Sequence, residues 1–254
     1  MTSAATARTA LITGAGRRIG AAIAHALSRA GYAVVLHAHR SRTDAEKLAA
    51  DIAAAGGQAK VVLADLADAK AVHRLVPAAA AFGPLTLLVN NASQFDEDEI
   101  ATLDHARFER TMAVNLTAPL FLAQAFAAQA PDNADASIVN IVDQRVLKPT
   151  PRFFSYTLSK SALASATATL AQALAPRLRV NAVAPGPTLP SPRQTAAQFA
   201  AQAAAVPLQR GPTPEDVAAA VLYLAQAKSV TGTVVAVDGG QHLAWRTIDS
   251  NEAE

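Results

Sequence analysis

The stretch Leu11-Ile-Thr-Gly-Ala-Gly-Arg-Arg-Ile-Gly20 decides the fold of this chain. An apolar strand runs into a glycine turn, and a helix follows directly. Such a turn makes room for a pyrophosphate over the helix N-terminus, where backbone N–H groups and the helix dipole favour anions. Gly14 permits the turn, and Gly20 lets the helix lie close to the sheet. The stretch therefore predicts a strand–turn–helix unit that binds a dinucleotide.

Short runs of branched apolar residues alternate with longer, Ala-rich helical segments along the rest of the chain. The strand candidates are Thr9–Thr13, Ala33–Ala38, Lys60–Ala64, Thr86–Asn90, Ser137–Val142, Arg179–Ala184 and Thr233–Asp238. The helical candidates are Arg18–Ala30, Thr43–Ala55, Lys70–Ala81, Leu103–Ala130, Ser155–Ala175 and Pro214–Gln226. Several strands are apolar on both faces, as parallel strands covered by helices must be. We predict one α/β domain over residues 1–254, a doubly wound parallel sheet (Rossmann fold) with helices on both faces.

The composition limits which classes of function are open. The chain has 254 residues, with 22 basic and 20 acidic side chains and no cysteine. Disulfides, thiolate catalysis and zinc–thiolate sites are thereby excluded. The nearly balanced charge, with no basic cluster, indicates neither a nucleic-acid nor a membrane partner. No segment reaches about 18 consecutive apolar residues, and residues 1–10 do not resemble a signal peptide. We expect a cytoplasmic protein that takes a small-molecule substrate and no metal.

Tyr156 and Lys160 lie four residues apart, on one face of a predicted helix. The pair supplies a proton donor and a cation that tunes it. An ammonium close to the phenol stabilises phenolate, so we expect the pKa of Tyr156 to fall from its usual value of about 10. These two residues predict an enzyme that moves a hydride and a proton.

The end of the second strand candidate indicates which nicotinamide cofactor is bound. NAD enzymes usually place a carboxylate there to accept bonds from the ribose hydroxyls. This chain instead has His39, Arg40 and Ser41, which offer donors and a fixed positive charge that suit a 2′-phosphate. We therefore predict NADPH. Arg18 at the start of the first helix is unfavourable for the helix dipole alone, and a bound diphosphate would reverse that balance.

A Pro-rich segment interrupts the alternating pattern near the C-terminus. Pro185–Pro192 is irregular, and the helical stretch Gln194–Ala205 follows it. We expect a substrate lid around residues 187–210, beyond the carboxyl edge of the sheet. The tail after Gly240 contains Trp245 and either packs on a neighbouring subunit or frays.

The chain resembles the short-chain dehydrogenase/reductase family over nearly its whole length. The matching pieces occur in this order: Thr13-Gly14 with Gly20, Asp65-Leu66, Asn90-Asn-Ala92, Asn115, Tyr156 with Lys160, Pro185-Gly186, and Thr231-Gly232 with Asp238-Gly-Gly240. Four local departures resemble the pteridine reductases and related dihydropteridine-type reductases. They are Arg18 in place of a glycine, the strand end His37–Ser41, the segment Asn90–Phe95, and Val142-Asp143 where most members carry a catalytic Ser.

This resemblance implies roles for individual residues. Tyr156, Lys160, Asp143 and Asn115 would be catalytic, with Lys160 bonded to the nicotinamide ribose and Asn115 steadying a water in the proton path. The substrate would contact Arg18, Ser93, Phe95, Asp143 and Tyr156, with Phe95 stacked on a pterin. The cofactor would contact Gly14, Arg18, Ile19, Gly20, His39, Arg40, Ser41, Asp65, Leu66, Asn90, Ala92, Ser93, Lys160, Pro185, Gly186 and Thr188. A homotetramer built on the helices of Asn115 and Tyr156 is also implied.

Asp143 decides which substrate class we expect. The usual Ser donates a hydrogen bond to a carbonyl oxygen that becomes an alkoxide, whereas an ionised Asp would repel that charge. A carboxylate can instead accept N–H groups from a heterocycle, and a protonated Asp143 could donate. Asp143, Tyr156 and Lys160 together therefore suit reduction of a C=N bond in a dihydropterin or folate-type substrate. A broad-specificity carbonyl reductase or alcohol dehydrogenase, and a non-catalytic NADPH-binding sensor or scaffold, stay open as alternatives.

Overall fold

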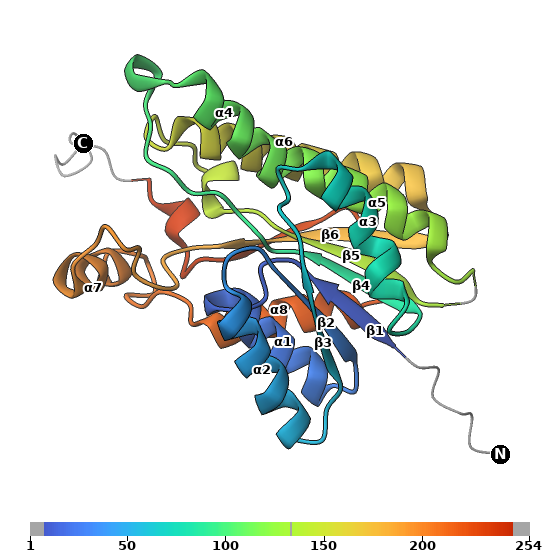
Figure 1. Cartoon of the computed structure of the whole chain (residues 1–254). Helices are drawn as coiled ribbons and strands as arrows, with labels where there is room; N and C mark the ends of the chain where they lie inside the picture. Colours follow the sequence, from blue (N-terminus) through green and yellow to red (C-terminus); the bar gives the residue numbers. More distant parts are fainter. Residues whose placement is uncertain (1–7, 133, 246–254) are drawn as a thin grey trace, which may run out of the picture.

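In the computed structural model, which describes residues 8–132 and 134–245, seven parallel strands form one sheet in the order β3-β2-β1-β4-β5-β6-β7 (Figure 1). The strands are β1 (Thr9–Ile12), β2 (Ala33–Ala38), β3 (Ala59–Leu63), β4 (Leu85–Asn90), β5 (Ala136–Ile141), β6 (Leu178–Pro185) and β7 (Val234–Val237). The predicted doubly wound fold is confirmed. The predicted strand ends differ from the observed ones by at most one residue.

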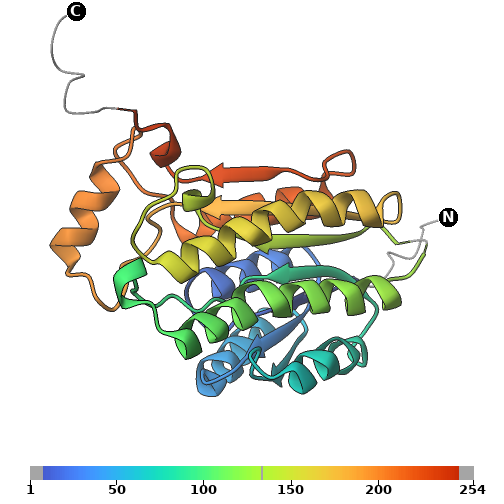
Figure 2. The same cartoon turned by 90° about the horizontal axis from the view of Figure 1, so that it is seen from above.

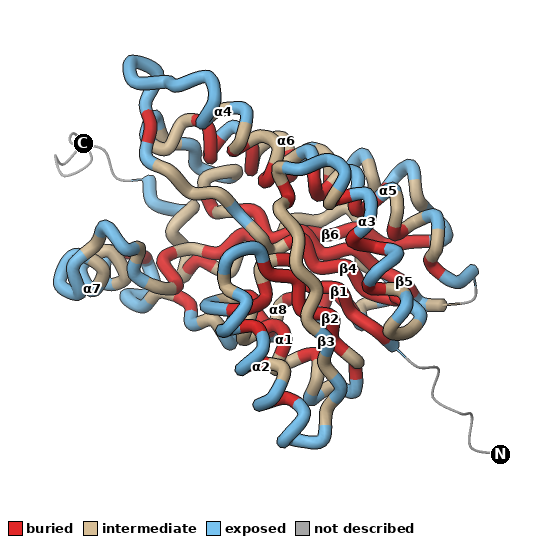
Figure 3. The backbone as a smooth tube through the Cα atoms, in the orientation of Figure 1, coloured by how far each residue is buried: buried red, intermediate tan, exposed pale blue. Residues whose placement is uncertain are grey.

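Helices cover both faces of the sheet, and each face has its own apolar core. α1 (Arg18–Arg29), α2 (Arg42–Ala54) and α8 (Pro214–Gln226) pack on one face, and α3 (Ala69–Ala80), α5 (Ala118–Gln129) and α6 (Phe154–Leu174) pack on the other. Alternation along the strands assigns residues to these cores, because neighbouring side chains point to opposite faces. In β1, Leu11 belongs to the core under α3 and α5, and Ile12 to the core under α1. The strands β1, β2, β4, β5 and β6 are consequently buried almost throughout, whereas β3 and β7, at the two edges of the sheet, are only partly buried (Figure 3).

The chain order reverses between β1 and β4, which lie side by side at the centre of the sheet. β1 continues outward to β2 and β3, whereas β4 continues to β5, β6 and β7. In open α/β sheets, ligands bind at this switch point, outside the carboxyl ends of the strands. α7 (Ala196–Ala204) lies beyond that end of the sheet, apart from the helices on the two faces (Figure 2).

The predicted helix Leu103–Ala130 is wrong as one continuous α-helix. A 3₁₀ turn, η1 (Ile100–Thr102), precedes α4 (His105–Met112), and η2 (Ala113–Thr117) is a π-helical turn between α4 and α5. Pro119 explains the change, because it has no N–H to donate to the carbonyl of Asn115 four residues earlier. The helix therefore widens at Asn115, and such π turns are frequent at functional sites.

The helical run His105–Gln129 is long and apolar enough to cross a membrane by length and composition alone. Core helices pass the same test, and here Leu122, Ala123 and Phe126 of this run are buried in the core that α5 shares with α3. The observed packing thus accounts for the apolar composition of this helix.

Candidate functional site

A cavity of about 1040 Å³ opens at the carboxyl edge of the sheet. Loops after β1, β2, β3, β4, β5 and β6 line it, together with the segment around α7. All but one of the predicted cofactor residues line this cavity, as do Phe95, Asp143 and Tyr156. Its volume lies at the upper end of the range of about 300–1,000 Å³ for small-molecule sites. The cavity therefore has room for a large ligand.

The two exceptions among the predicted site residues are Asn90 and Asn115, which do not line the cavity. The amide of Asn90 is buried and donates to Oδ1 of Asn140 at 2.9 Å. Asn115 Oδ1 accepts the backbone N–H of Gln94 at 2.7 Å, and its Nδ2 donates to Gln94 O and to Ser159 Oγ. The side-chain amide of Asn115 thus fixes the loop after β4 to α6, and the predicted role of Asn115 in steadying a water stays a prediction.

The glycine turn after β1 is tied to the loop after β4. Oγ1 of Thr13 accepts the backbone N–H groups of Asn91 (2.9 Å) and Ala92 (3.0 Å). In return, Nδ2 of Asn91 donates to the carbonyls of Thr13 and Gly14. Gly14 has a φ of +63°, and a Cβ on it would come within 2.9 Å of Ala92 Cα. Only glycine fits this position without displacing the neighbouring backbone.

The start of α1 has the properties of an anion site. No acidic residue lies in its first turn, and the N-cap residue Arg17 makes no side-chain capping bond. Among the residues that the structure describes, no side chain caps the N–H groups at this end, and a diphosphate fits them and the adjoining Arg17 and Arg18 by charge and hydrogen bonding. A Cβ on the nearby Gly16 would come within 2.9 Å of Ser41 Oγ, so the turn leaves no space for a side chain there.

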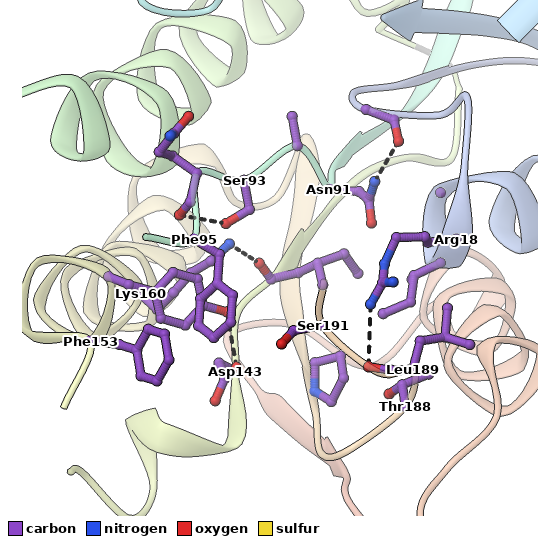
Figure 4. Close-up of a pocket in the computed structure, with 18 of the residues that line it drawn as sticks. Arg18, Asn91, Ser93, Phe95, Asp143, Phe153, Lys160, Thr188, Leu189 and Ser191 are labelled. Atoms are coloured by element: carbon purple, nitrogen blue, oxygen red, sulfur yellow. Dashed lines mark hydrogen bonds between the residues drawn. The ribbon is translucent and has the colours of Figure 1, made fainter. Parts of the chain in front are cut away.

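Arg18 has a left-handed backbone, with a φ of +57°. This conformation costs a non-glycine residue about 1 kcal/mol or more and persists mainly at functional sites. Its guanidinium donates to the carbonyls of Pro190 (2.9 Å) and Leu189 (3.3 Å) in the predicted lid (Figure 4). Arg18 therefore connects the glycine turn to the lid segment across the cavity.

The end of β2 carries basic and hydrogen-bonding groups at the cavity. His39, Arg40 and Ser41 all line it, and Arg40 is exposed. His39 and Arg110 both contact the carboxylate of Asp65 after β3, at 3.6 Å and 3.2 Å. Among the described residues Arg40 makes no ion pair, so its exposed guanidinium is open to an anionic group such as a 2′-phosphate.

His37 is a cavity residue to which the sequence assigned no role. Its Nδ1 accepts the N–H of Gly14 at 3.2 Å, so its Nε2 carries the proton toward Ala64 O at 3.1 Å. Burial lowers the pKa of His37 to about 4, so the ring is neutral at physiological pH. His37 thus anchors the glycine turn to β2 and β3 without adding charge.

Tyr156 and Asp143 form the polar pair at the far end of the cavity. The Tyr156 hydroxyl donates to Asp143 Oδ2 at 2.9 Å. Burial raises the pKa of Tyr156 well above 10, and the charge and hydrogen bond of Asp143 raise it further. The expected lowering of this pKa by Lys160 is therefore wrong. Lys160 Nζ donates to Ile141 O at 2.7 Å and lies 5.8 Å from the centre of the Tyr156 ring.

Lys160 is one of the largest fully buried side chains. Burial lowers its pKa to about 8, and the charge of Asp143 opposes that shift. The ammonium is thus still the main form at neutral pH, but the fold holds it at a cost. A buried charge maintained in this way is typical of functional sites.

Sequence reasoning missed Asp98, which holds the start of α6. Its carboxylate is 3% exposed and accepts the backbone N–H of Ser155 at 3.1 Å as well as the Ser155 hydroxyl. The local N-cap residue, Phe153, is left-handed with a φ of 55° and provides no side-chain cap. Asp98 is 57 residues away in sequence, so no local capping pattern could have identified it.

Sequence reasoning also assigned no role to Arg145 and Phe153. Nη1 of Arg145 lies 3.2 Å from each carboxylate oxygen of Asp143, and the Arg145 backbone N–H donates to Oδ1 at 2.9 Å. Phe153 stacks on Phe95 with ring centres 4.4 Å apart and an angle of 8° between the planes (Figure 4). The cavity end that contains Tyr156 is therefore both aromatic and cationic.

The fold and this site define a nicotinamide-dependent oxidoreductase. The family model described as Enoyl-(Acyl carrier protein) reductase matches residues 14–242. Pteridine reductase 1 of Leishmania tarentolae is 35% identical, over 96% of this chain and 99% of the relative. The 3-oxoacyl-[acyl-carrier-protein] reductase of Synechocystis sp. is 33% identical, over 94% of this chain and 98% of that protein. The chain belongs to the short-chain dehydrogenase/reductase family.

A solved structure gives a more specific likeness. FolM alternative dihydrofolate reductase 1 from Brucella canis, complexed with NADP, is 50% identical with a TM-score of 0.92. The alignment covers 95% of this chain and 96% of that one. The predicted resemblance to the family, including its pteridine reductase branch, is confirmed.

The left-handed backbone of Arg18 leads to a first prediction. Arg18→Gly keeps the turn and removes both the strain and the guanidinium. We expect unchanged or slightly higher thermal stability, together with a KM for NADPH raised about tenfold or more, which corresponds to about 1.4 kcal/mol of binding. Thermal unfolding and steady-state kinetics measure the two effects. Arg29→Gly, in the exposed last turn of α1, is the control; equal KM values for Arg18→Gly and the parent would contradict a role for Arg18 in cofactor binding.

A second prediction follows from the buried ammonium. An unfolded Lys titrates near 10.4 and Lys160 near 8 in the fold, so between these values the unfolded chain binds more protons. The stability contribution of Lys160 therefore rises with pH across that window, and its full cost is present below it. We expect Lys160→Met to abolish turnover but to raise the Tm of the ligand-free protein at neutral pH, at about 2–4 °C per kcal/mol. The gain should shrink above about pH 8.

Thermal unfolding at several pH values measures this trend. Lys70→Met removes an exposed ammonium and is the matched control. A Lys160→Met protein less stable than the parent at neutral pH would mean that the hydrogen bond to Ile141 O outweighs the desolvation cost.

Proposed function

We propose that this protein is an NADPH-dependent reductase that transfers a hydride to a C=N bond of a dihydropterin or dihydrofolate-type substrate, with Tyr156 as the proton donor. One observation carries the proposal: the Tyr156 hydroxyl is bonded at 2.9 Å to a carboxylate where most family members have Ser. The names of the Brucella and Leishmania relatives, an alternative dihydrofolate reductase and a pteridine reductase, support the same substrate class.

The cofactor follows from the donor set. NADPH would supply the hydride when bound. The free N–H groups of α1, with Arg17 and Arg18, would bind its diphosphate, and His39, Arg40 and Ser41 would bind its 2′-phosphate. NADP in the Brucella structure and NADPH in the related blue fluorescent protein from a metagenomic library agree with this choice.

The protonation state of Tyr156 suits reduction. Because burial and Asp143 hold the pKa of Tyr156 well above 10, the residue carries its proton at physiological pH and can give it to a ring nitrogen. A ketone would place a developing alkoxide beside the Asp143 carboxylate, which like charges disfavour. A heterocycle instead presents N–H groups that this carboxylate accepts. The site therefore favours C=N over C=O reduction.

Phe95 provides a flat wall for such a ring. It stacks on Phe153 and meets the Tyr156 ring edge-on, with centres 4.6 Å apart. Offset stacking on an aromatic wall is worth about 0.5–1.5 kcal/mol beyond the area that it buries. We assign Phe95 as the aromatic residue against which the pterin lies.

We further propose that residues 1–254 act as one catalytic domain and that residues 187–210 form its lid. Arg18 attaches this segment to the glycine turn through Pro190 O and Leu189 O, and Arg193 attaches it to the loop after β4 through Phe95 O. A homotetramer built on α5 and α6 is supported by Phe121 and Leu158, which are 52% and 43% exposed on these helices.

The test is steady-state NADPH oxidation with dihydrobiopterin, dihydromonapterin and dihydrofolate, beside several ketones. We expect turnover of the pterins that falls by about 10²–10⁴ in Tyr156→Phe, the range for loss of a positioned acid. Asp143→Ser should depress pterin turnover and favour ketones. Ketone turnover without pterin activity would replace the proposal with a carbonyl reductase. Tight NADPH binding with no turnover of any substrate would indicate a sensor or scaffold.

Arg40 tests the cofactor assignment separately. Arg40→Asp removes the cation and adds a charge that repels a 2′-phosphate. We expect kcat/KM with NADPH to fall about a hundredfold, or about 2.7 kcal/mol, and kcat/KM with NADH to be nearly unchanged. Arg42→Asp, two residues along on the exposed side of α2, is the control. An equal loss with both cofactors would contradict the 2′-phosphate contact.

A further inference from the structure

Two arginines lie beside the aromatic pair at the substrate end of the cavity. The Arg145 guanidinium carbon is 5.6 Å and 5.3 Å from the ring centres of Phe95 and Phe153, and that of Arg193 is 5.3 Å and 5.5 Å from them. A cation above the outer face of one ring would be much closer to that ring centre than to the other. The nearly equal distances therefore place each guanidinium beside the edges of the two rings. Each cation therefore lies at an edge of the aromatic pair, where a substituent of a ring stacked on Phe95 could reach it.

Arg145 and Arg193 differ in whether an acidic side chain pairs with their charge. Arg145 is paired with Asp143, and the rim residue Arg152 lies 3.9 Å from Glu99. Within residues 8–132 and 134–245, Arg193 makes no ion pair; one of its nitrogens, Nη2, donates to Phe95 O at 3.0 Å. A guanidinium has five N–H donors in a fixed fork, so Arg193 keeps most of them for a ligand. It is an exposed, uncompensated cation on the lid.

The cofactor phosphates do not account for Arg193. Their proposed contacts are at the start of α1 and the end of β2, whereas Arg193 is bonded to the loop that carries Phe95. Phe95 in turn contacts the Tyr156 ring, which carries the phenol. In the part of the chain that the structure describes, Nε of Arg145 is also buried without a hydrogen-bond partner at this end. A buried donor left unpaired is costly, and an acceptor on a ligand would relieve that cost.

We propose that Arg193 forms a subsite for an anionic group on the substrate, a carboxylate or a phosphate attached to the reduced ring system, with Arg145 at an edge of the same aromatic pair. This inference rests on the proposed function and adds a preference within it. The planar fork of an arginine matches both anions with two parallel hydrogen bonds. The lid would thus select substrates by their substituent, while Phe95, Asp143 and Tyr156 handle the ring.

Glu97 offers a second test of the proposed subsite, because its charge is opposite to that of Arg193. It is exposed, lines the same cavity and follows Phe95 by two residues. Its carboxylate repels an anionic substituent, so Glu97→Gln and Arg193→Gln should change the preference for anionic substrates in opposite directions. A loss of folding or of loop position would move both variants in the same direction.

The experiment compares kcat/KM for dihydrofolate, dihydroneopterin phosphate and the uncharged dihydrobiopterin in the parent enzyme and in Arg193→Gln. We expect a loss of about tenfold or more, through KM, for the anionic substrates and less than about twofold for dihydrobiopterin. Loss with dihydrofolate alone identifies a carboxylate site, and loss with the phosphate ester alone identifies a phosphate site. Arg152→Gln, at the same rim but already paired, is the control and should leave the ratio unchanged.

Equal losses with charged and uncharged substrates would overturn the subsite, because they would show that Arg193 only positions Phe95. If the parent enzyme reduces none of these compounds, the proposed function fails. Calorimetric binding of folate and biopterin to the NADP⁺ complex then still tests the subsite, since a selective loss of folate affinity in Arg193→Gln supports it and unchanged affinities refute it.

Discussion

The hydrogen bonds between Thr13 and Asn91 are the constraint on which the site depends. They join the turn after β1 to the loop after β4, at the point where the order of strands reverses. Because a parallel sheet leaves a crevice there, a fixed distance between these two segments sets the floor of the cavity. Gly14 lies against Ala92 on that floor, His37 anchors the turn from β2, and Asn115 fixes the β4 loop to α6. The residues proposed to bind the cofactor and those proposed to bind the substrate therefore share one support.

Burial determines the electrostatics at the end of the cavity that contains Tyr156 and Asp143. Tyr156, Lys160 and Asp143 are removed from most of the solvent, so each charge affects its neighbours strongly. Burial and Asp143 raise the pKa of Tyr156, so the phenol keeps its proton, whereas burial lowers the pKa of Lys160. The result is a phenol ready to donate beside an ammonium that is maintained at the expense of stability. The fold would be more stable with a neutral group at this buried position, so the charge on Lys160 is kept at the expense of stability.

The fold and the cofactor half of the site could be predicted from sequence because their signals are local. Alternating apolar runs mark the strands, and the segments Leu11–Gly20 and His39–Ser41 carry their chemistry within a few residues. The π-helical turn was missed because it depends on a missing N–H at Pro119, four residues beyond Asn115. Asp98 and Phe153 were missed because their contacts join segments far apart in the chain. The direction of the Tyr156 pKa shift was wrong because spacing alone reveals neither the burial of the phenol nor its hydrogen bond to Asp143, which raise this pKa. It also cannot reveal that Lys160 bonds to Ile141 O.

The capping of α6 from a distance has a consequence for how the site can adapt. Asp98 satisfies the first turn of the helix that carries Tyr156, and it lies only three residues after Phe95. If the loop moved outward to admit a bulkier ring, the helix would lose its cap and the phenol its fixed position. The size of the ring that the site accepts is therefore linked to the position of the Tyr156 phenol. Substrates of other shapes would have to be accommodated on the side of the cavity formed by residues 187–210. In engineering terms, the proposed lid over residues 187–210 would be the exchangeable part, whereas the Phe95 loop and α6 would have to be redesigned together.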